Sequence, residues 1–102
     1  GLFSAVAGMA RSDRFASLTI LGYGWGSNYP LVTPDRAIPT QFGCGNSDGF
    51  DSGAISSEAF LSGQGHATRL VAAPGIGHSF TGIMSAMPPS DMFAWMDQHT
   101  AP

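Results

Sequence analysis

The sequence predicts an α/β fold in which three parallel strands are flanked by helices. Apolar segments alternate between helix-like spacing and short strand-like runs, in the order helix, strand, loop, strand, helix, strand, loop, helix. This alternation is typical of parallel strands joined by helical crossovers. One strand-like run, residues 15–22, is apolar almost throughout, which suits a strand covered on both faces. A chain of 102 residues has room for one small domain or a piece of a larger one.

The first half of the chain is predicted to contain a helix, a strand and a loop. Residues 15–22 are predicted as a strand because they are rich in strand formers and end in glycine. Dense glycine and proline predict a loop over residues 23–39. Before these, residues 1–12 are predicted as a helix because apolar residues recur at helical spacing, at Leu2, Phe3, Val6, Met9 and Ala10.

The middle of the chain is predicted to contain two strands, over residues 40–45 and 67–73, with a helix between them. Ser52 is expected to cap this helix, which runs to about Leu61. Its inward-facing residues are expected to be Ile55, Ala59 and Phe60.

A last helix is expected to begin at Ser90, which can cap it, with Asp91 in its first turn. A carboxylate there suits the helix dipole. The apolar side of this helix is expected to consist of Met92, Phe93, Trp95 and Met96.

Composition indicates a packed chain with little charge. Apolar residues make up 43%, enough for a core. Charged residues make up 11%, against about 25% in ordinary soluble domains. Either another polypeptide covers part of the surface, or the surface is neutral and rich in small residues.

Several classes of protein fit the sequence poorly. The four cations are all arginines and the net charge is −3, so no basic patch is available for nucleic acid. The single cysteine, Cys44, cannot form an intrachain disulfide, which leaves the cellular compartment open. No run approaches the ~20 apolar residues of a membrane span, and residues 1–10 do not resemble a signal peptide.

Two predicted loops carry the residues that could perform chemistry. Asp48 follows the second predicted strand, and His78 follows the third. Loops at the carboxyl ends of neighbouring parallel strands meet at one edge of a sheet. A carboxylate that orients an imidazole is part of a nucleophilic triad. By spacing alone, the alternative is that Asp48 forms a turn and His78 has a backbone partner.

Four segments resemble the C-terminal half of the α/β-hydrolase superfamily. Residues 45–48 (Gly-Asn-Ser-Asp) are similar to the family's acid motif G-x-x-D, and residues 75–78 (Gly-Ile-Gly-His) to its histidine motif G-x-G-H. Residues 91–99 resemble the family's final helix, and residues 11–22 resemble the segment that follows its nucleophile helix.

The resemblance implies that residues 1–102 are the C-terminal part of a single α/β-hydrolase domain. Gly1 then matches the last glycine of the nucleophile elbow, G-x-S-x-G-G, so the nucleophile lies upstream or on another chain. The serines Ser4, Ser47 and Ser79 are interpreted as helix, turn or hydrogen-bonding residues rather than nucleophiles.

The activity that the resemblance implies is hydrolysis of a carboxylic ester by a serine esterase or lipase. His78 would be the general base and Asp48 the acid that orients it. The implied partners are a small ester substrate and the missing N-terminal part of the hydrolase, without which activity is not expected. No metal or organic cofactor is implied.

Two alternative functions remain open. One is a non-catalytic split or truncated fragment that acts as a structural or binding subunit. The other is a dehalogenase or epoxide hydrolase with an aspartate nucleophile, although such enzymes usually carry a larger cap than residues 23–39 allow.

Several residues have alternative interpretations. Asp51 is a second candidate for the acid, but it can also cap the following helix. His66 and His99 are predicted to lie on the surface, and Cys44 is predicted to be a small buried strand residue. A substrate pocket, or else core and loop packing, is predicted for Trp25, Tyr29, Phe50, Phe80, Met84 and Met87.

Overall fold

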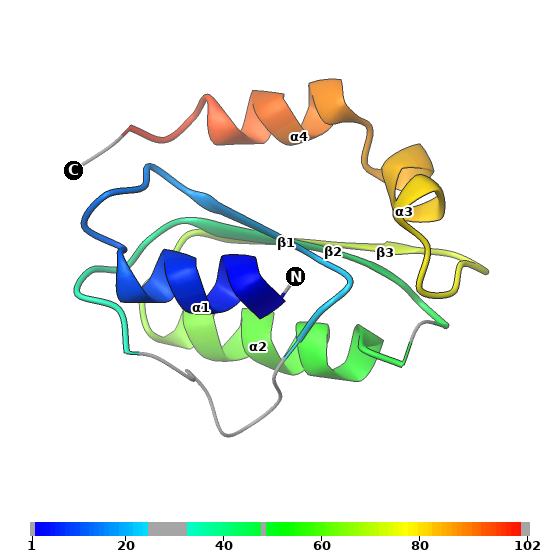
Figure 1. The fold of residues 1–102 in the computed structure, drawn as a ribbon, viewed down its shortest axis with the longest axis horizontal. Helices are drawn as coiled ribbons and strands as arrows, with labels where there is room; N and C mark the ends of the chain where they lie inside the picture. The colour runs from blue at the N-terminus through cyan, green and yellow to red at the C-terminus, as the bar shows by residue number, and fades with distance from the viewer. Residues whose placement is uncertain (1, 25–32, 48, 101–102) are drawn as a thin grey trace.

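The computed structural model describes residues 2–24, 33–47 and 49–100, which form a parallel sheet with helices on both faces (Figure 1). The three strands are β1 (Leu18–Leu21), β2 (Thr40–Gly45) and β3 (Thr68–Ala73), in the order β1-β2-β3. Each lies within a segment predicted as a strand, and the predicted α/β class is confirmed. The central strand β2 is buried at every residue, because it has a strand on each side and helices on both faces.

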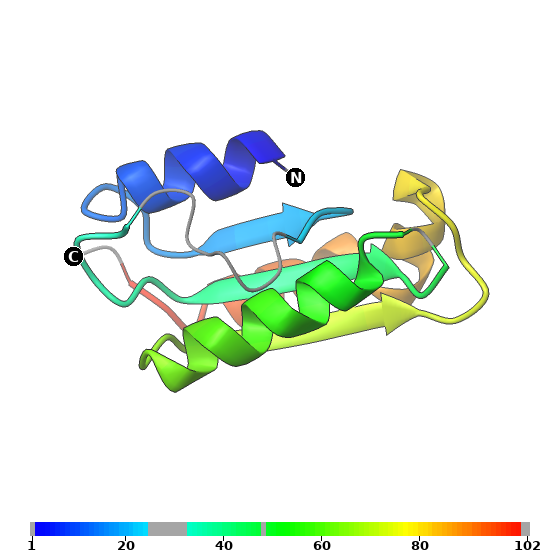
Figure 2. The same cartoon turned by 90° about the horizontal axis from the view of Figure 1, so that it is seen from below.

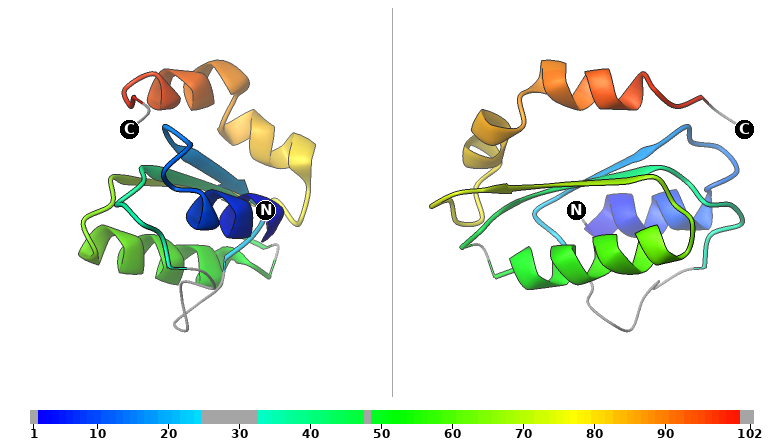
Figure 3. Two further views of the ribbon diagram at one scale, coloured as in Figure 1. Left: turned by 60° about the vertical axis from the view of Figure 1, so that its left-hand side comes forward. Right: turned by 180° about the vertical axis from the view of Figure 1, so that it is seen from behind.

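The sheet is covered by a different pair of helices on each face. Figures 2 and 3 show α1 and α2 on one face and α3 and α4 on the other. Among the described residues, no helix is long and apolar enough to cross a membrane. The helices are α1 (Leu2–Ala10), α2 (Asp51–Gly63), α3 (Phe80–Ala86) and α4 (Pro89–Met96).

The main core lies between the sheet and the helices α1 and α2. Phe60 packs against this core, which confirms its predicted inward position, and buried Cys44 is part of it, also as predicted. On the opposite face, Ile83 and Met87 pack over Gly43, where an added Cβ would lie 2.6 Å from the Met87 sulfur. The buried members of the main core are Ala5, Met9, Leu18, Ile20, Ile38, Phe42, Cys44, Ala54 and Leu61.

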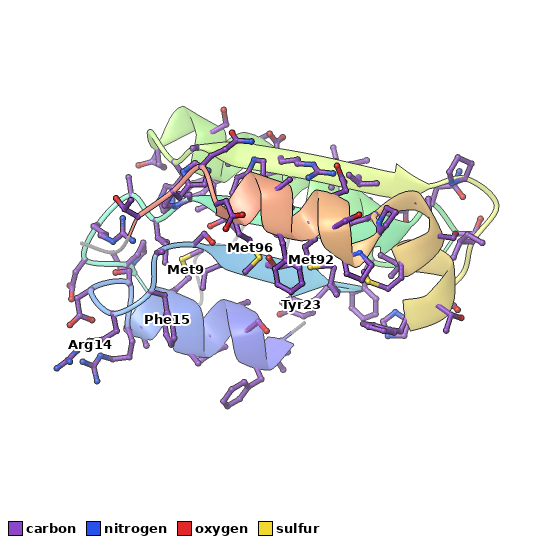
Figure 4. All side chains as sticks on the ribbon, turned by 90° about the horizontal axis from the view of Figure 1, so that it is seen from above. Met9, Arg14, Phe15, Tyr23, Met92 and Met96 are labelled. Atoms are coloured by element: carbon purple, nitrogen blue, oxygen red, sulfur yellow. The ribbon has the colours of Figure 1, made fainter. Side chains whose placement is uncertain are left out.

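Helix α4 is tied to the sheet by polar contacts, and none of its residues is buried. Gln41 of β2 is fully buried and donates from Nε2 to Thr19 Oγ1 (2.9 Å) and to the Met92 carbonyl (3.2 Å). Arg69 of β3 pairs with Asp91 and also donates to Oε1 of Gln41 (3.4 Å). Figure 4 shows α4 lying across this face of the sheet. A buried amide therefore links the central strand to α4.

The start and the inward face of α2 differ from the prediction. The helix begins at Asp51, and Phe50 precedes it without a side-chain capping bond, so Ser52 is not the cap. The predicted inward positions Ile55 and Ala59 are exposed. Ser57 lies on the buried face of α2 and interrupts its apolar pattern. The serine is tolerated there because its hydroxyl donates to the Gly53 carbonyl, four residues earlier (2.6 Å). The buried residues are Ala54, Ser57 and Leu61.

Two features near the C-terminus also differ from the prediction. Helix α3 occupies a segment predicted as loop; its cap is Ser79, whose Oγ accepts from the Gly82 N–H (3.2 Å). Helix α4 begins at Pro89, so Ser90 is not its cap, although Asp91 lies in the first turn as predicted. Proline suits the start of a helix because an N–H there has no helical partner.

We expect Gln41→Leu to destabilise the fold and to loosen α4. The substitution leaves Thr19, Arg69 and the Met92 carbonyl without a buried partner, at a cost of about 1–3 kcal/mol. Urea unfolding and amide hydrogen exchange of α4 measure the two effects. The control is Gln98→Leu, at an exposed position just after α4. Equal stability of the two variants would contradict the role of Gln41.

Candidate functional site

The loops after β2 and β3 are joined at the carboxyl edge of the sheet. Asn46 Oδ1 accepts from the Gly75 N–H (2.9 Å), and the Ser47 N–H donates to the Ile76 carbonyl (3.0 Å). The Asn46 N–H also donates to the Ala73 carbonyl at the end of β3 (3.0 Å). The prediction that these two loops meet at one rim of a parallel sheet is confirmed.

Gly45 permits this close approach of the two loops. A Cβ added there would overlap the carbonyl oxygens of Ile76 and Gly77, which are main-chain atoms with little freedom to move. Gly75 supplies the turn itself, with φ at +69°, a conformation that residues with side chains rarely adopt. The segment that leads to His78 is therefore constrained by the close contact at Gly45 and by the turn at Gly75.

His78 reaches across the sheet edge from the end of β3 to the end of β1. Its ring lies on Gly22, where an added Cβ would be 2.8 Å from Cε1. Gly22 has φ at +64°, so both its backbone conformation and the ring above it exclude a side chain. The Phe50 ring lies against the imidazole, with centroids 5.3 Å apart and planes inclined by 46°. The imidazole nevertheless remains exposed.

A small pocket of about 80 Å³ opens beside His78. Leu21, Phe80 and Ile83 give it apolar walls, while Gly22 and Ser79 complete its lining. Phe80 thus lines a pocket beside His78, and its role in substrate binding stays a prediction. Such a volume suits a group of few atoms rather than a long chain.

The structure describes only one of the two candidate acids. Asp48 lies outside the described residues and stays a prediction. Asp51 is the first residue of α2, where its carboxylate suits the positive end of the helix dipole. In the part of the chain that the structure describes, no hydrogen bond joins Asp51 to His78. Asp51 therefore stays the alternative candidate for the acid, placed in the first turn of α2.

The remaining predicted pocket residues do not form one group. Trp25 and Tyr29 lie outside the described residues. The Phe50 ring packs at a tilt against the His78 imidazole and against Tyr23, whose ring centroid is 5.8 Å away. Among the methionines, Met84 is half-buried in α3, and Met87 is fully buried as part of the core.

Ser47 and Ser79 have local hydrogen bonds, as predicted, and Ser4 lies on a helix. Ser79 caps α3 through Gly82. Ser47 donates to Asn46 Oδ1 (3.2 Å). Ser4 lies on α1. No hydrogen bond to His78 from any of these three serines occurs within residues 2–24, 33–47 and 49–100.

The other two histidines are less exposed than predicted. His66 is only 8% exposed, and its Nδ1 donates to the Ile38 carbonyl (2.7 Å). His99 lies against Trp95, with ring centroids 4.5 Å apart, and its Nε2 is buried. The His66 contact could not be predicted from sequence pattern, because its partner carbonyl is 28 residues away. Trp95 precedes His99 by four residues, a helical spacing that the sequence does show. His66 does lie at the amino end of β3, far from His78, as predicted.

Within the described ranges, no three His, Cys, Asp or Glu side chains lie together as ligands for a metal ion. No family model, curated protein or solved structure matches the chain. What the site does must therefore be argued from its own geometry.

We expect Gly45→Ala to separate the two loops and to destabilise the fold by about 1–3 kcal/mol, because the added methyl overlaps main-chain oxygens. Urea unfolding gives the stability, and amide chemical shifts of residues 75–79 report the loop.

The control is Gly63→Ala at the end of α2, where an added Cβ meets nothing within 4 Å. This change should be neutral or slightly stabilising. If Gly45→Ala behaves like Gly63→Ala, the close approach of the loops is wrong.

Proposed function

We propose that this chain is the C-terminal part of an α/β-hydrolase that cleaves carboxylic esters. The chain contributes the histidine and the acid of a Ser-His-Asp triad, and the serine lies outside this sequence. One observation carries the proposal: His78 is held over the end of β1, at the edge where the loop leading to Asp48 is bonded to its own loop.

In this proposal His78 moves protons at the reacting centre. It takes the proton from the serine hydroxyl as that oxygen attacks the ester carbonyl, and then gives it to the departing alcohol. The acyl-enzyme is cleaved when His78 takes a proton from water and returns it to the serine. The exposed position of the imidazole supports this role, because substrate and water can reach it.

Asp48 is the acid of the proposed triad. It directly follows Ser47, whose N–H is bonded to Ile76 two residues before His78. An aspartate that accepts from one ring nitrogen fixes the tautomer and stabilises the protonated imidazole. The place of Asp51 at the start of α2 supports Asp48 over Asp51.

One side of β1 pairs with no described strand, and further strands of the sheet would add there. The N–H groups of Leu18 and Gly22 bond toward β2, so by strand alternation those of Thr19 and Leu21 point to the other side. Unpaired strand edges are templates for a further strand. Among the described strands, β1 pairs only with β2, which supports a partner segment that continues the sheet.

Apolar surface gathers at the same side of the molecule. Phe3 is 82% exposed and Phe15 45%, and between them a groove of about 190 Å³ runs between α1 and β1. Figure 4 shows Phe15 on the turn that joins these two elements. Exposed aromatic side chains beside an unpaired edge are typical of a surface that another polypeptide covers. The low charge of the chain agrees with this.

The direction of α1 also supports an upstream nucleophile. Its amino end lies near the carboxyl end of β1, the same edge that carries His78 (Figure 2). A nucleophile elbow is a tight turn from a strand into a helix. A strand added beside β1 and leading into α1 would bring its serine to the His78 edge. The small pocket beside His78 favours esters with a short acyl group.

One observation favours a second function: within the described residues, Ser47 and Ser79, which flank the candidate acid and His78, make local hydrogen bonds instead of bonds to His78. In that case the exposed groove at α1 and β1 would serve binding alone, and the chain would be a structural subunit.

Hydrolysis of p-nitrophenyl acetate tests the proposal. We expect no turnover by the 102-residue chain alone, and turnover when the chain is joined to or copurified with the segment that completes the sheet. Turnover by the chain alone would contradict the placement of the nucleophile. Inactivity in both forms would favour the structural subunit.

In the completed enzyme, His78→Ala should reduce kcat/KM by several orders of magnitude while the far-UV spectrum stays unchanged. The control is His99→Ala, a histidine on the α4 side of the molecule, which should retain activity. A loss of less than about tenfold in His78→Ala would reject His78 as the base.

The acid is tested by comparing Asp48→Asn with Asp51→Asn in the same enzyme. An amide at the triad position favours the wrong tautomer of the histidine, so Asp48→Asn should lower kcat by about 10⁴-fold. Asp51→Asn removes only a favourable charge from the start of α2 and should cost far less activity. A larger loss of activity in Asp51→Asn than in Asp48→Asn would identify Asp51 as the acid.

A further inference from the structure

A larger cavity lies at the opposite edge of the sheet from His78. It measures about 310 Å³ and lies between residues 33–37, which precede β2, and the carboxyl end of α2. Ligand pockets typically have volumes of about 300–1,000 Å³. The cavity shares no described residue with the pocket beside His78.

One wall of this cavity is anchored to the turn between α1 and β1. The buried Ser12 hydroxyl accepts from the N–H groups of Asp35 (2.8 Å) and Arg36 (3.3 Å). The Arg36 guanidinium donates in return to the carbonyls of Ser12 (2.6 Å), Phe15 and Ala16. The wall therefore has a defined position, and the arginine charge is already engaged by main-chain oxygens.

His66 gives the cavity one oriented acceptor. Its Nδ1 donates to the Ile38 carbonyl (2.7 Å), so in the neutral ring the lone pair lies on Nε2. The His66 N–H is bonded to the Leu61 carbonyl at the end of α2 (3.0 Å), which fixes the residue at the cavity. Nε2 can thus accept one hydrogen bond from a ligand.

The other lining side chains define the rest of the ligand. Pro34 and Phe60 are half-buried apolar side chains of the lining, which suits a flat ring. Asp35 and Arg36 carry opposite charges, so the cavity has no net charge to attract an ion. We propose that this cavity binds a small neutral aromatic molecule with a hydroxyl group, whose O–H donates to Nε2 of His66.

Phenol is the probe, and anisole is the matched ligand that has no O–H. In ¹⁵N–¹H spectra of the 102-residue chain, we expect saturable phenol binding with shift changes confined to residues 33–38 and 60–66. Shift changes centred on residues 75–80 would place phenol at the other edge and contradict the proposal. The absence of saturable binding would also contradict it.

His66→Asn tests the hydrogen bond. The asparagine NH₂ can retain the bond to the Ile38 carbonyl while the Nε2 acceptor is lost. Phenol affinity should fall about two- to tenfold, the value of one neutral hydrogen bond, and anisole affinity should stay unchanged. The matched control, His99→Asn, should change neither. An equal effect on both ligands would contradict the role of Nε2.

Ala37→Trp keeps the test decisive if His66→Asn does not fold. Ala37 is an exposed residue on the cavity wall, so a large side chain there can occupy the cavity without disturbing the core. We expect loss of both phenol and anisole binding. Unchanged phenol binding in this variant would overturn the assignment of the site.

Discussion

The arrangement of this molecule depends on the contact between two loops at the carboxyl edge of its sheet. Asn46 and Ser47 bond to Gly75 and Ile76, and Gly45 leaves room for the main chains to approach. These bonds direct the chain after β3 so that His78 crosses the edge and lies on Gly22. The proposed triad depends on this contact, and the small pocket beside His78 lies at the same end of the strands.

The two faces of the sheet are held in different ways, which bears on where other molecules bind. Helices α1 and α2 bury the main apolar core, whereas α4 is tied to the sheet through Gln41 and Arg69. The side of β1 that pairs with no described strand, and the groove beside it, favour a further strand. The cavity at His66 lies at the other end of the strands, so its proposed ligand and the proposed ester chemistry are independent.

The strands and the loop contact could be predicted from sequence, but several side-chain positions could not. The apolar run that contains β1 and the turn residues around β2 and β3 were sufficient to predict parallel strands and adjacent loops. The inward face of α2 was not predictable, because buried Ser57 breaks the apolar pattern and its hydroxyl is satisfied inside the helix. His66 was predicted to be exposed but is buried. The carbonyl that accepts from its ring is 28 residues away in sequence, so no local pattern indicates the contact. Asp48 stays a prediction.

The most direct test of this account is the position of the His78 imidazole relative to Gly22. Nuclear Overhauser effects can be measured between the His78 ring protons and the α-protons of Gly22 in the isotope-labelled chain. The account predicts a cross-peak from the His78 Hε1 proton to Gly22, since Cε1 is the ring atom nearest to it. Cross-peaks from that proton only to residues of its own loop would show that His78 does not reach β1, and would contradict the proposed site.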